Sequence, residues 1–349
     1  MTVNVAVLGL GYWGPNLLRN LVSLENVKVV ALCDLDVKRA EVFRRRLCPA
    51  ARVVGEYHLL ADDPQVDAVV VGTPIRTHCE FGSLFISSGK HVFIEKPLAR
   101  TAEECRTLID LAERHNRVLM VGHVFEYNVA VRRIRQYLES GELGKLFYVY
   151  SQRVNLGRIQ RDVNALWSFA PHDVSIMNYW FGQEPARVSA RGFSYLSRGI
   201  EDVVFITLEY PNGVGAHLHL GWLDPRKVRL MTLVGSKKML VYDDVSVDRK
   251  IQIYDKGIAD LHDFLEAPES FAEFQFQLRV GNVVIPTLKF GEPLQGECQH
   301  FIDCIQNDRR PLTDGLSGFR VVKVLEAAQQ SLRGNGEYIE LSTESNPIG

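Results

Sequence analysis

Short apolar runs and longer stretches with helical spacing alternate through the first 122 residues of the chain. The runs are rich in β-branched residues and apolar at consecutive positions, which is typical of strands buried on both faces. Strands joined by helices in this way form a parallel sheet with helices on both sides, a doubly wound α/β domain. The strand-forming runs are VNVAVLG, VKVVALCD, VDAVVVGTP, HVFIEKP and RVLMVGH.

From about residue 145 the runs become longer, and many alternate between apolar and polar positions. The turn sequences PNG and GSKK join neighbouring runs, which predicts hairpins and a mostly antiparallel sheet. Helices are expected at Asn128–Glu139 and near residues 295–307 and 316–333. The predicted fold is an α/β domain at residues 1–122, followed by an α+β domain with a mostly antiparallel, open-faced sheet at residues 123–349.

Composition narrows the class of protein. The 349 residues are 46% hydrophobic and 23% charged, with a formal net charge of −2, so neither nucleic acid nor a membrane surface is expected as a partner. No apolar run reaches the ~18 residues of a membrane helix, and the N-terminus lacks the basic segment of a signal peptide. Six cysteines without CxxC spacing indicate free thiols. We expect a cytoplasmic protein with a small-molecule substrate.

The segment VAVLGLGYWGPNLL carries Gly9, Gly11 and Gly14 in GxGxxG spacing, between a predicted strand and a predicted helix. Gly9 allows a tight turn, Gly11 lets the backbone approach a pyrophosphate, and Gly14 allows close packing of helix and strand. The pattern predicts a dinucleotide-binding loop, and the alternative is a glycine-rich turn without a ligand. Tyr12 and Trp13 lie inside this loop and are counted among its cofactor-binding residues.

Asp34 follows the second predicted strand, twenty residues after Gly14. A carboxylate at this position accepts hydrogen bonds from the adenosine ribose hydroxyls, and it repels a 2′-phosphate. NAD is therefore favoured as the cofactor, while Lys38 and Arg39 nearby leave NADP as the alternative.

A second strand end is expected in the ligand crevice, because sheets of this type bind ligands at the carboxyl ends of their strands. Gly72, Thr73 and Pro74 follow a buried strand and are expected to turn over the cofactor. His78 begins the next helix, either as a cofactor contact or as a capping or surface histidine.

Glu95 and Lys96 follow the next strand along the chain. A partly desolvated lysine in a crevice has a lowered pKa and can exchange protons with a hydroxyl group. The two residues are therefore predicted either to take part in chemistry or to form an ion pair in a surface turn.

His172 and Asp173 stand side by side in LWSFAPHDVSIMNYWFG, an apolar helical stretch. Pro171 suits the first turn of a helix, which places His172 near the helix N-terminus. The positive end of the helix dipole would then lower the pKa of His172 and keep it neutral, ready to accept a proton. A satisfied core histidine is the alternative.

The order of these motifs resembles one family. A GxGxxG loop with Asp34, then GTPIRTH, then EKPLA, then a lone histidine on a helix is similar to the glucose-fructose oxidoreductase, inositol dehydrogenase and rhizopine-catabolism (Gfo/Idh/MocA) family. The segments NALWSFAPHDVSI and WLDPRKVRLMTLVGSKKMLVYDD resemble its branch associated with nucleotide sugars and polysaccharide biosynthesis.

The resemblance implies an NAD(P)-binding Rossmann domain, a second domain whose open sheet forms homodimers or homotetramers, and catalytic roles for Lys96 and His172 at the nicotinamide. One position departs from the family pattern. The family usually has an aspartate four residues before the histidine, where this chain has Ser168. Asp173 does not replace it, because neighbouring residues do not share a helix face. Asp173 is expected either to cap the helix or to contact the substrate.

The segment SQRVNLGRIQRDVN precedes the histidine helix and is rich in arginine and asparagine. Arginine suits phosphate because its guanidinium presents paired donors, so a diphosphate-linked sugar would fit here. The alternatives are a solvated loop and, for the asparagine at position 128, a helix cap. The candidate substrate-binding residues are Asn128, Arg153, Asn155, Arg158, Arg161, Ser168 and Asp173.

His217 and His219 share one face of a predicted strand, but no third ligand stands in register, so no metal site is predicted. Our hypothesis is reversible hydride transfer between NAD and a ring carbon of a sugar, in a 3-dehydrogenase or 3-ketoreductase of nucleotide-linked hexoses. One alternative is a dehydrogenase of free sugars or inositol. Another is a non-catalytic NAD-binding sensor or scaffold, which Ser168 in place of the family aspartate would favour.

Overall fold

The computed structural model describes residues 2–157, 159, 163–258 and 278–341. Contacts between Cα atoms divide the chain into two compact units. The first comprises Met1–Asn128 and Gly291–Glu326, and the second comprises Val129–Phe290 and Ala327–Gly349. This division differs from a single boundary after residue 122, because a late segment of the chain packs with the first unit.

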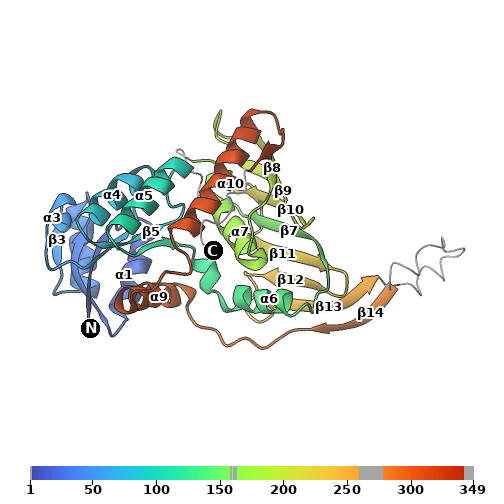
Figure 1. Cartoon of the computed structure of the whole chain (residues 1–349), viewed down its shortest axis with the longest axis horizontal. Coiled ribbons are helices and arrows are strands. Elements are labelled where there is room, and N and C mark those ends of the chain that lie inside the picture. The colour runs from blue at the N-terminus through green and yellow to red at the C-terminus, as the bar shows by residue number, and fades with distance from the viewer. Residues whose placement is uncertain (1, 158, 160–162, 259–277, 342–349) are drawn as a thin grey trace, which may run out of the picture. The chain divides into compact units, whose positions relative to one another are not determined.

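The first unit contains a six-stranded parallel sheet in the order β3-β2-β1-β4-β5-β6. The order reverses between β1 and β4, and sheets of this type bind dinucleotides outside the carboxyl ends of the strands at that point. Figure 1 shows α4 and α5 on one face of the sheet and α1 and α9 on the other. The strands are β1 (Val3–Leu8), β2 (Val27–Cys33), β3 (Arg52–Val54), β4 (Ala68–Val71), β5 (His91–Glu95) and β6 (Leu119–Gly122).

The helices of this unit bury apolar side chains against the sheet. One continuous core includes Val5 of β1, Leu17 of α1 and Phe301 of α9, so the late helix completes the core of the first domain. The helices are α1 (Gly14–Val22), α2 (Val37–Leu47), α3 (His58–Ala61), α4 (His78–Ser87), α5 (Ala102–Arg114) and α9 (Pro293–Asn307), with the 3₁₀ helices η1 (Ile75–Thr77) and η2 (Val124–Tyr127). The helix α10 (Gly315–Arg333) begins in this unit and ends in the second.

The second unit is built on a nine-stranded sheet in the order β14-β13-β12-β11-β7-β10-β9-β8-β15. Its paired strands in the described chain are antiparallel except β10 and β7, which run parallel. The predicted hairpins at PNG and GSKK are the β9–β10 and β11–β12 pairs. The strands are β7 (Leu146–Val154), β8 (Arg187–Phe193), β9 (Val203–Glu209), β10 (Gly215–Gly221), β11 (Val228–Gly235), β12 (Met239–Asp243), β13 (Ile251–Ile258), β14 (Leu278–Val284) and β15 (Ile339–Glu340).

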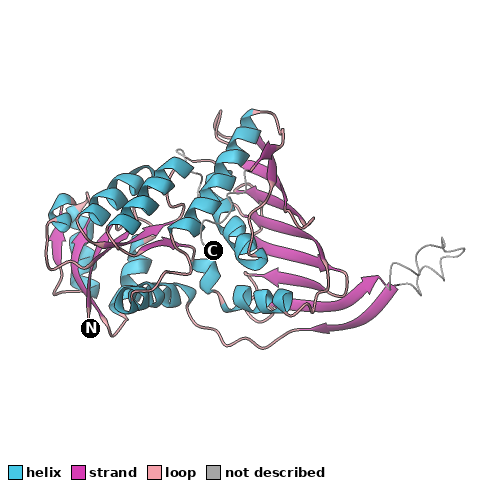
Figure 2. Ribbon diagram, in the orientation of Figure 1, coloured by secondary structure: helices cyan, strands magenta, loops and turns pink. Residues whose placement is uncertain are grey.

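One face of this sheet packs against helices, as Figure 2 shows for the magenta strands and the cyan helices of the second unit. These helices are α6 (Val129–Glu139) and α7 (Ala165–Phe181). Side chains of β9 alternate between buried and half-buried along the whole strand, so one face is core and the other is open. The predicted fold class, a parallel α/β domain and an α+β domain with an open, mostly antiparallel sheet, is confirmed.

Candidate active site

The glycine loop is shaped by close contacts at two of its three glycines. Gly9 has a left-handed φ of +91°, and a Cβ atom there would lie 2.8 Å from the carbonyl oxygen of Gly72. A Cβ atom at Gly14 would overlap the carbonyl oxygen of Gly9. Gly11 is exposed, and no atom lies within 4 Å of where its Cβ would be. The loop therefore needs Gly9 and Gly14 to fold, while the space at Gly11 leaves room for a pyrophosphate.

The N-terminus of α1 has the properties of an anion site. The helix begins at Gly14, with Trp13 as its N-cap residue and a proline in its first turn. In the described chain no side chain caps this end and no acidic residue lies in the first turn. The partial positive charge of the helix end is therefore not compensated, and its N–H groups suit a phosphate. Tyr12 and Trp13 beside it are 82% and 37% exposed.

Asp34 follows β2 and ties that strand to the loop. Its Oδ2 accepts the N–H of Leu10 at 2.6 Å, and its Oδ1 accepts the N–H of Asp36 at 2.8 Å. Each carboxylate oxygen has a second lone pair, so both can still accept a ribose hydroxyl. Arg39 Nη1 lies 3.9 Å from Asp34 Oδ1. The loop, the helix end and this carboxylate together fit an NAD molecule.

His78, at the start of α4 as predicted, is buried and joins two strand-end turns. Its Nδ1 lies 2.9 Å from the carbonyl oxygen of Pro97, and its Nε2 lies 2.8 Å from that of Thr73. Burial lowers the pKa of His78 more than the carbonyl groups raise it. Both ring nitrogens thus face the chain's own backbone, and the imidazole holds the turn of Gly72–Pro74 against the turn after Lys96.

Glu95 and Lys96 form a close pair of titratable residues at the carboxyl end of β5. The N–H of Lys96 donates to Glu95 Oε2 at 3.2 Å. On β6, a Cβ atom at Gly122 would lie 3.0 Å from Glu95 Oε2. Burial raises the pKa of Glu95 to about 7, against the lowering effect of the Lys96 charge. Glu95 is therefore a buried acid and not part of a surface turn.

The helix that carries His172 differs from the prediction at its N-terminus. α7 begins at Ala165, after the N-cap Asn164, whose Oδ1 accepts the N–H of Trp167 at 3.2 Å. Pro171 therefore lies inside the helix, and His172 lies about two turns from its start. The expected effect of the helix dipole on His172 is wrong, because that effect is confined to the first turn. The alternative in which Asp173 caps the helix is wrong because Asn164 is the cap.

Ser168 and His172 lie on one partly exposed side of α7. They are four residues apart, so they stand one turn apart on the same face. Both side chains are half-buried, and so is Phe169 between them. This face carries the polar groups expected at the substrate.

Two of the candidate substrate-binding residues bind each other instead. Arg153 of β7 donates from Nε at 2.8 Å and from Nη2 at 2.6 Å to Oδ1 of Asp173. The two side chains are 5% and 1% exposed. Burial lowers the pKa of Arg153, but the charge and hydrogen bonds of Asp173 outweigh this and raise it. The pair is a buried ion pair that fastens α7 to β7.

Arg229 of β11 is a candidate that the sequence reasoning missed. Its Nη1 donates to the carbonyl oxygens of Val154 at 3.0 Å and Val228 at 2.8 Å, and its Nη2 donates to Oδ1 of Asn155 at 2.5 Å. Its guanidinium lies 5.3 Å from the centre of the Phe169 ring. The only sequence signal is one charged residue at the start of the apolar strand VRLMTLVG.

Arg229 and Arg153 differ in their pKa shifts and in whether a carboxylate is bonded to them. Burial, followed by the neighbouring charge of Arg153, lowers the pKa of Arg229 to about 10. Within the described residues, Arg229 forms no ion pair with a carboxylate, whereas Arg153 is paired with Asp173. Arg229 thus presents a cation without a bonded counterion beside the partly exposed side of α7.

The remaining candidates are placed as follows. Asn155 is held by Arg229, as described above, and its N–H donates to the carbonyl oxygen of Gly221. Asn128 ends η2 and is 8% exposed. Arg158 and Arg161 lie outside the described residues.

The described residues show no metal-binding cluster, disulfide or membrane-spanning helix. The described part of the chain holds no group of three or more His, Cys, Asp or Glu side chains arranged to bind a metal ion. His217 and His219 of β10 stack on Phe205, with ring centres 6.3 Å and 4.6 Å apart. The six cysteines are free thiols. Among the described helices, none combines the length and apolarity needed to cross a membrane.

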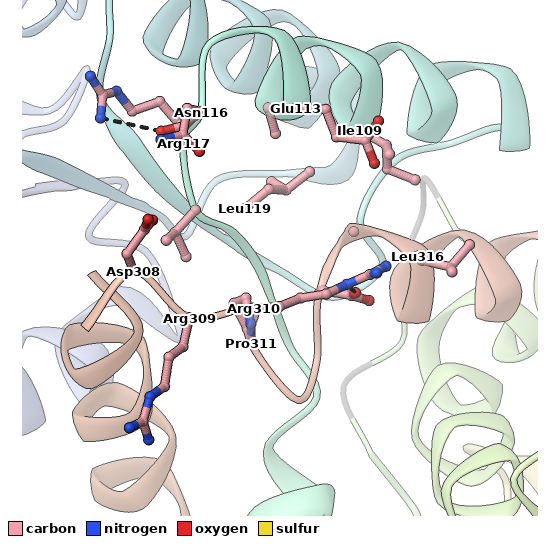
Figure 3. A pocket seen from close by; sticks show the side chains of 14 residues that line it. Ile109, Glu113, Asn116, Arg117, Leu119, Asp308, Arg309, Arg310, Pro311 and Leu316 are labelled. Carbon is pink, nitrogen blue, oxygen red and sulfur yellow. Dashed lines mark hydrogen bonds and ion pairs between the residues drawn. The ribbon is translucent and has the colours of Figure 1, made fainter. Parts of the chain in front are cut away.

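A pocket of about 360 Å³ lies in the first unit, away from these residues (Figure 3). Figure 3 shows side chains of α5, such as Ile109 and Glu113, facing the segment that carries Arg310 and Pro311. Leu119, the first residue of β6, also lines the pocket. The pocket is therefore at the amino ends of the strands, whereas the glycine loop and Lys96 are at the carboxyl ends. None of the predicted site residues lines it.

Comparison with known proteins places this geometry in a family. A family model described as "Oxidoreductase family, NAD-binding Rossmann fold" matches residues 3–123, and one described as "GFO/IDH/MocA C-terminal domain" matches residues 131–241. Inositol 2-dehydrogenase from Pseudomonas fluorescens (strain SBW25) is 26% identical, and the alignment covers 99% of each chain. The first model describes an oxidoreductase family and this relative is a dehydrogenase, which favours an enzyme over a non-catalytic NAD-binding protein.

Solved structures share the fold. UDP-N-acetylglucosamine 3-dehydrogenase from Acidithiobacillus ferrooxidans has a TM-score of 0.79 and 22% identity, covering 96% of this chain and 99% of that one. Scyllo-inositol dehydrogenase from Lactobacillus casei, solved with NAD(H) and scyllo-inositol, has a TM-score of 0.78 and 17% identity, covering 97% and 99%. With a dinucleotide loop that fits NAD and both family models matched in order along the sequence, the chain belongs to the Gfo/Idh/MocA family of NAD-dependent oxidoreductases.

Proposed function

We propose that this enzyme transfers a hydride to or from a ring carbon of a nucleotide-linked hexose, as a 3-dehydrogenase or 3-ketoreductase. The observation that carries the proposal is the guanidinium of Arg229 beside the Ser168–His172 face of α7. Arginine binds phosphate and carboxylate groups through paired N–H donors. A nucleotide sugar brings a diphosphate to such a group, whereas a free hexose or an inositol brings no charge.

The charges around Arg229 support an anionic substrate. Asp173 is occupied by Arg153. Asp244 accepts the hydroxyl of Tyr242 at 3.0 Å and lies 3.5 Å from the Nζ of Lys250. Both nearby carboxylates therefore have partners of their own, and the positive charge of Arg229 is left for a ligand.

The residues of the chain are assigned the following roles. When bound, NAD supplies the nicotinamide carbon that accepts or gives the hydride. Gly11 and the N-terminus of α1 hold its pyrophosphate, and Asp34 holds the adenosine ribose. Lys96 takes the proton of the sugar hydroxyl during oxidation and returns it during reduction. His172 is the second acid–base or orienting group.

Ser168 contributes in a different way from the aspartate that usually stands at its position. A hydroxyl donates and accepts hydrogen bonds but carries no charge. We assign Ser168 a contact with a sugar hydroxyl one helical turn from His172. Cytoplasmic location, a role in polysaccharide biosynthesis, and assembly into a homodimer or homotetramer through the open face of the second sheet belong to the same proposal.

A second candidate is a dehydrogenase of inositol or free sugars. It is favoured by the likeness to inositol 2-dehydrogenase, which extends over 99% of both chains. The two candidates differ in their need for Arg229, because an uncharged substrate gains little from a phosphate-binding guanidinium.

The test is to follow NADH absorbance with the purified full chain and a panel of substrates. The panel contains UDP- and dTDP-hexoses, the matching free hexoses, and myo-inositol. Under the main proposal, turnover occurs with a nucleotide hexose and is lost in both Lys96→Ala and His172→Ala. Arg229→Gln lowers kcat/KM by about 10- to 100-fold, as expected for loss of a hydrogen bond to a charged group worth ~1.5–3 kcal/mol.

Arg226→Gln is the matched control, because Arg226 is an exposed arginine on the same segment. It should leave kcat/KM unchanged. Turnover of inositol or a free hexose that Arg229→Gln does not affect would establish the second candidate and overturn the first.

A further inference from the structure

The first unit buries polar side chains that it does not pair. Glu297 of α9 is 0% exposed, and neither of its carboxyl oxygens has a hydrogen-bond partner among the described residues. His123 is 1% exposed, and neither of its ring nitrogens has a hydrogen-bond partner among the described residues. An ionised carboxylate in such surroundings is so costly that the group keeps its proton instead. A fully buried acid of this kind needs an explanation.

Packing between α9 and β5 brings Glu297 toward Glu95, which lies beside Lys96. Phe93 and Glu95 are two residues apart on β5 and point to the same face. Glu297 and Phe301 are four residues apart on α9 and lie on one side of that helix. The rings of Phe93 and Phe301 meet edge to face, with centres 5.8 Å apart. This contact holds the side of α9 that carries Glu297 against the face of β5 that carries Glu95.

Titratable groups near Glu297 come from several segments of the first unit. β5 contributes Glu95, with Lys96 following it. The segment after β6 contributes His123, Glu126 and Tyr127, and α9 itself contributes Cys298. These groups determine which residue changes its charge near neutral pH.

The pKa shifts of these groups identify Glu95 as the one that changes its charge near neutral pH. Burial, and then the charges of Glu95 and Glu126, raise the pKa of Glu297 well above its usual range. Burial and the Lys96 charge lower the pKa of His123 to about 3, so His123 is neutral. Burial raises the pKa of Cys298, which is also neutral. Glu95 accepts the N–H of Lys96 and stands beside its ammonium, whereas neither oxygen of Glu297 has a hydrogen-bond partner among the described residues, so Glu95 ionises before Glu297.

We propose that Glu297 and Glu95 form a coupled carboxyl pair in which Glu297 retains its proton and Glu95 ionises first, which places a negative charge beside Lys96. The inference rests on the proposed role of Lys96 as the acid–base. During oxidation the hydroxyl proton of the substrate passes to the Lys96 amine, and the ammonium that forms is stabilised by the adjacent Glu95 carboxylate. Two carboxyl groups coupled in this way ionise in two separate steps.

The test is an infrared pH titration of the full chain, which detects protonated carboxyl groups directly and needs no substrate. Above neutral pH ordinary Asp and Glu residues are ionised, so any remaining carboxylic acid band belongs to an anomalous group. The wild type should lose one such band near pH 7, from Glu95, and keep a second at higher pH, from Glu297.

Two variants assign the bands and measure the coupling. Glu297→Gln should remove the persistent band and leave the Glu95 transition. Glu95→Gln should remove the Glu95 transition and move the loss of the Glu297 band to lower pH, because the repelling charge is gone. Glu113→Gln, at an exposed acid of α5, is the control and should change neither. If Glu297→Gln fails to fold, the wild-type titration and Glu95→Gln still decide the matter.

Competitive acylation of Lys96, read by mass spectrometry, tests the link to the lysine. The pH midpoint of acylation should fall in Glu95→Gln, because the ammonium loses its neighbouring anion, and should stay in place in Glu113→Gln. Absence of a persistent acid band in the wild type, or a Glu297 band that Glu95→Gln does not move, overturns the proposal. None of these measurements requires turnover, so they fail or succeed independently of the substrate proposed above.

Discussion

The two units bury charge in opposite ways. In the second unit, Arg153 and Asp173 are both buried and neutralise each other through two hydrogen bonds. In the first unit, Glu95 and Glu297 are both buried and of like sign, and the conflict is relieved by protonation. A buried pair of opposite charges makes stability depend on keeping both partners. A buried pair of like charges makes the protonation state depend on pH, which is a property that an acid–base site can use.

The largest effect is expected from breaking the opposite-charge pair. Arg153→Met leaves Asp173 buried without its partner, which costs ~3–5 kcal/mol of stability. The double variant Arg153→Met with Asp173→Leu should recover most of this loss, because no unpaired charge remains. Thermal denaturation of the full chain measures both. Equal destabilisation in the single and double variants would show that packing, and not charge pairing, dominates here.

The like-charge pair should show its effect in the pH dependence of stability. The pKa of Glu95 rises from 4.5 to about 7 on folding, so the folded state holds a proton that the unfolded state has released. The stability contribution is complete below about pH 4.5 and is lost as the pH rises to about 7, by an amount on the order of 3 kcal/mol. Glu95→Gln should flatten this part of the stability curve, and Glu113→Gln should not. Parallel curves for Glu95→Gln and the wild type would contradict the shift.

Asp34 sharpens the comparison, because it is a buried acid of the first unit whose two oxygens are both hydrogen-bonded. We expect the charge of Asp34 to affect which cofactor binds, because a carboxylate repels the 2′-phosphate of NADP. Asp34→Ser removes the repulsion of a 2′-phosphate and leaves Arg39 to attract it. We expect the ratio of NAD to NADP affinity to fall by about 10- to 100-fold, equivalent to ~1.5–3 kcal/mol. Fluorescence titration with NADH and NADPH measures this, and an unchanged ratio would remove Asp34 from cofactor selection.

The smallest effect concerns Arg229, which forms no ion pair with a carboxylate among the described residues. UDP should stabilise the wild type by about 1 kcal/mol at a few times its Kd, through contact with Arg229. Arg229→Gln should abolish this stabilisation and Arg226→Gln should preserve it, as judged from the shift in Tm with added UDP. Equal shifts in both variants would place the nucleotide elsewhere.

The parts of the structure that could be predicted from sequence are those with a local signal. Buried apolar runs separated by helices identify the parallel sheet, and the spacing of Gly9, Gly11 and Gly14 identifies the loop because each glycine has a separate steric reason. The strand ends at Thr73 and Lys96 follow from the rule that ligands bind at the carboxyl ends of strands.

The parts that were missed depend on contacts between distant residues. The position of Pro171 suggests a helix start, but Asn164 caps α7 about two turns earlier, and Pro171 lies inside it. The pairing of Arg153 with Asp173 joins a strand to a helix and has no signature in either segment. Glu297 did leave a signal that went unused: it is an acidic residue on the apolar stripe formed by Leu294 and Phe301, and a charge on such a stripe has to be protonated or paired.

Gly11 has a further practical consequence. It is exposed, its backbone does not require a left-handed φ, and a side chain there meets nothing within 4 Å. The chain's own cysteines are buried, apart from the half-buried Cys79. A cysteine introduced at position 11 would therefore be the most accessible thiol in the described chain, and a dye attached to it would stand where the pyrophosphate is expected. Bound cofactor should shield this thiol, so the rate at which the dye reacts with it would report cofactor occupancy, independent of which sugar the enzyme uses.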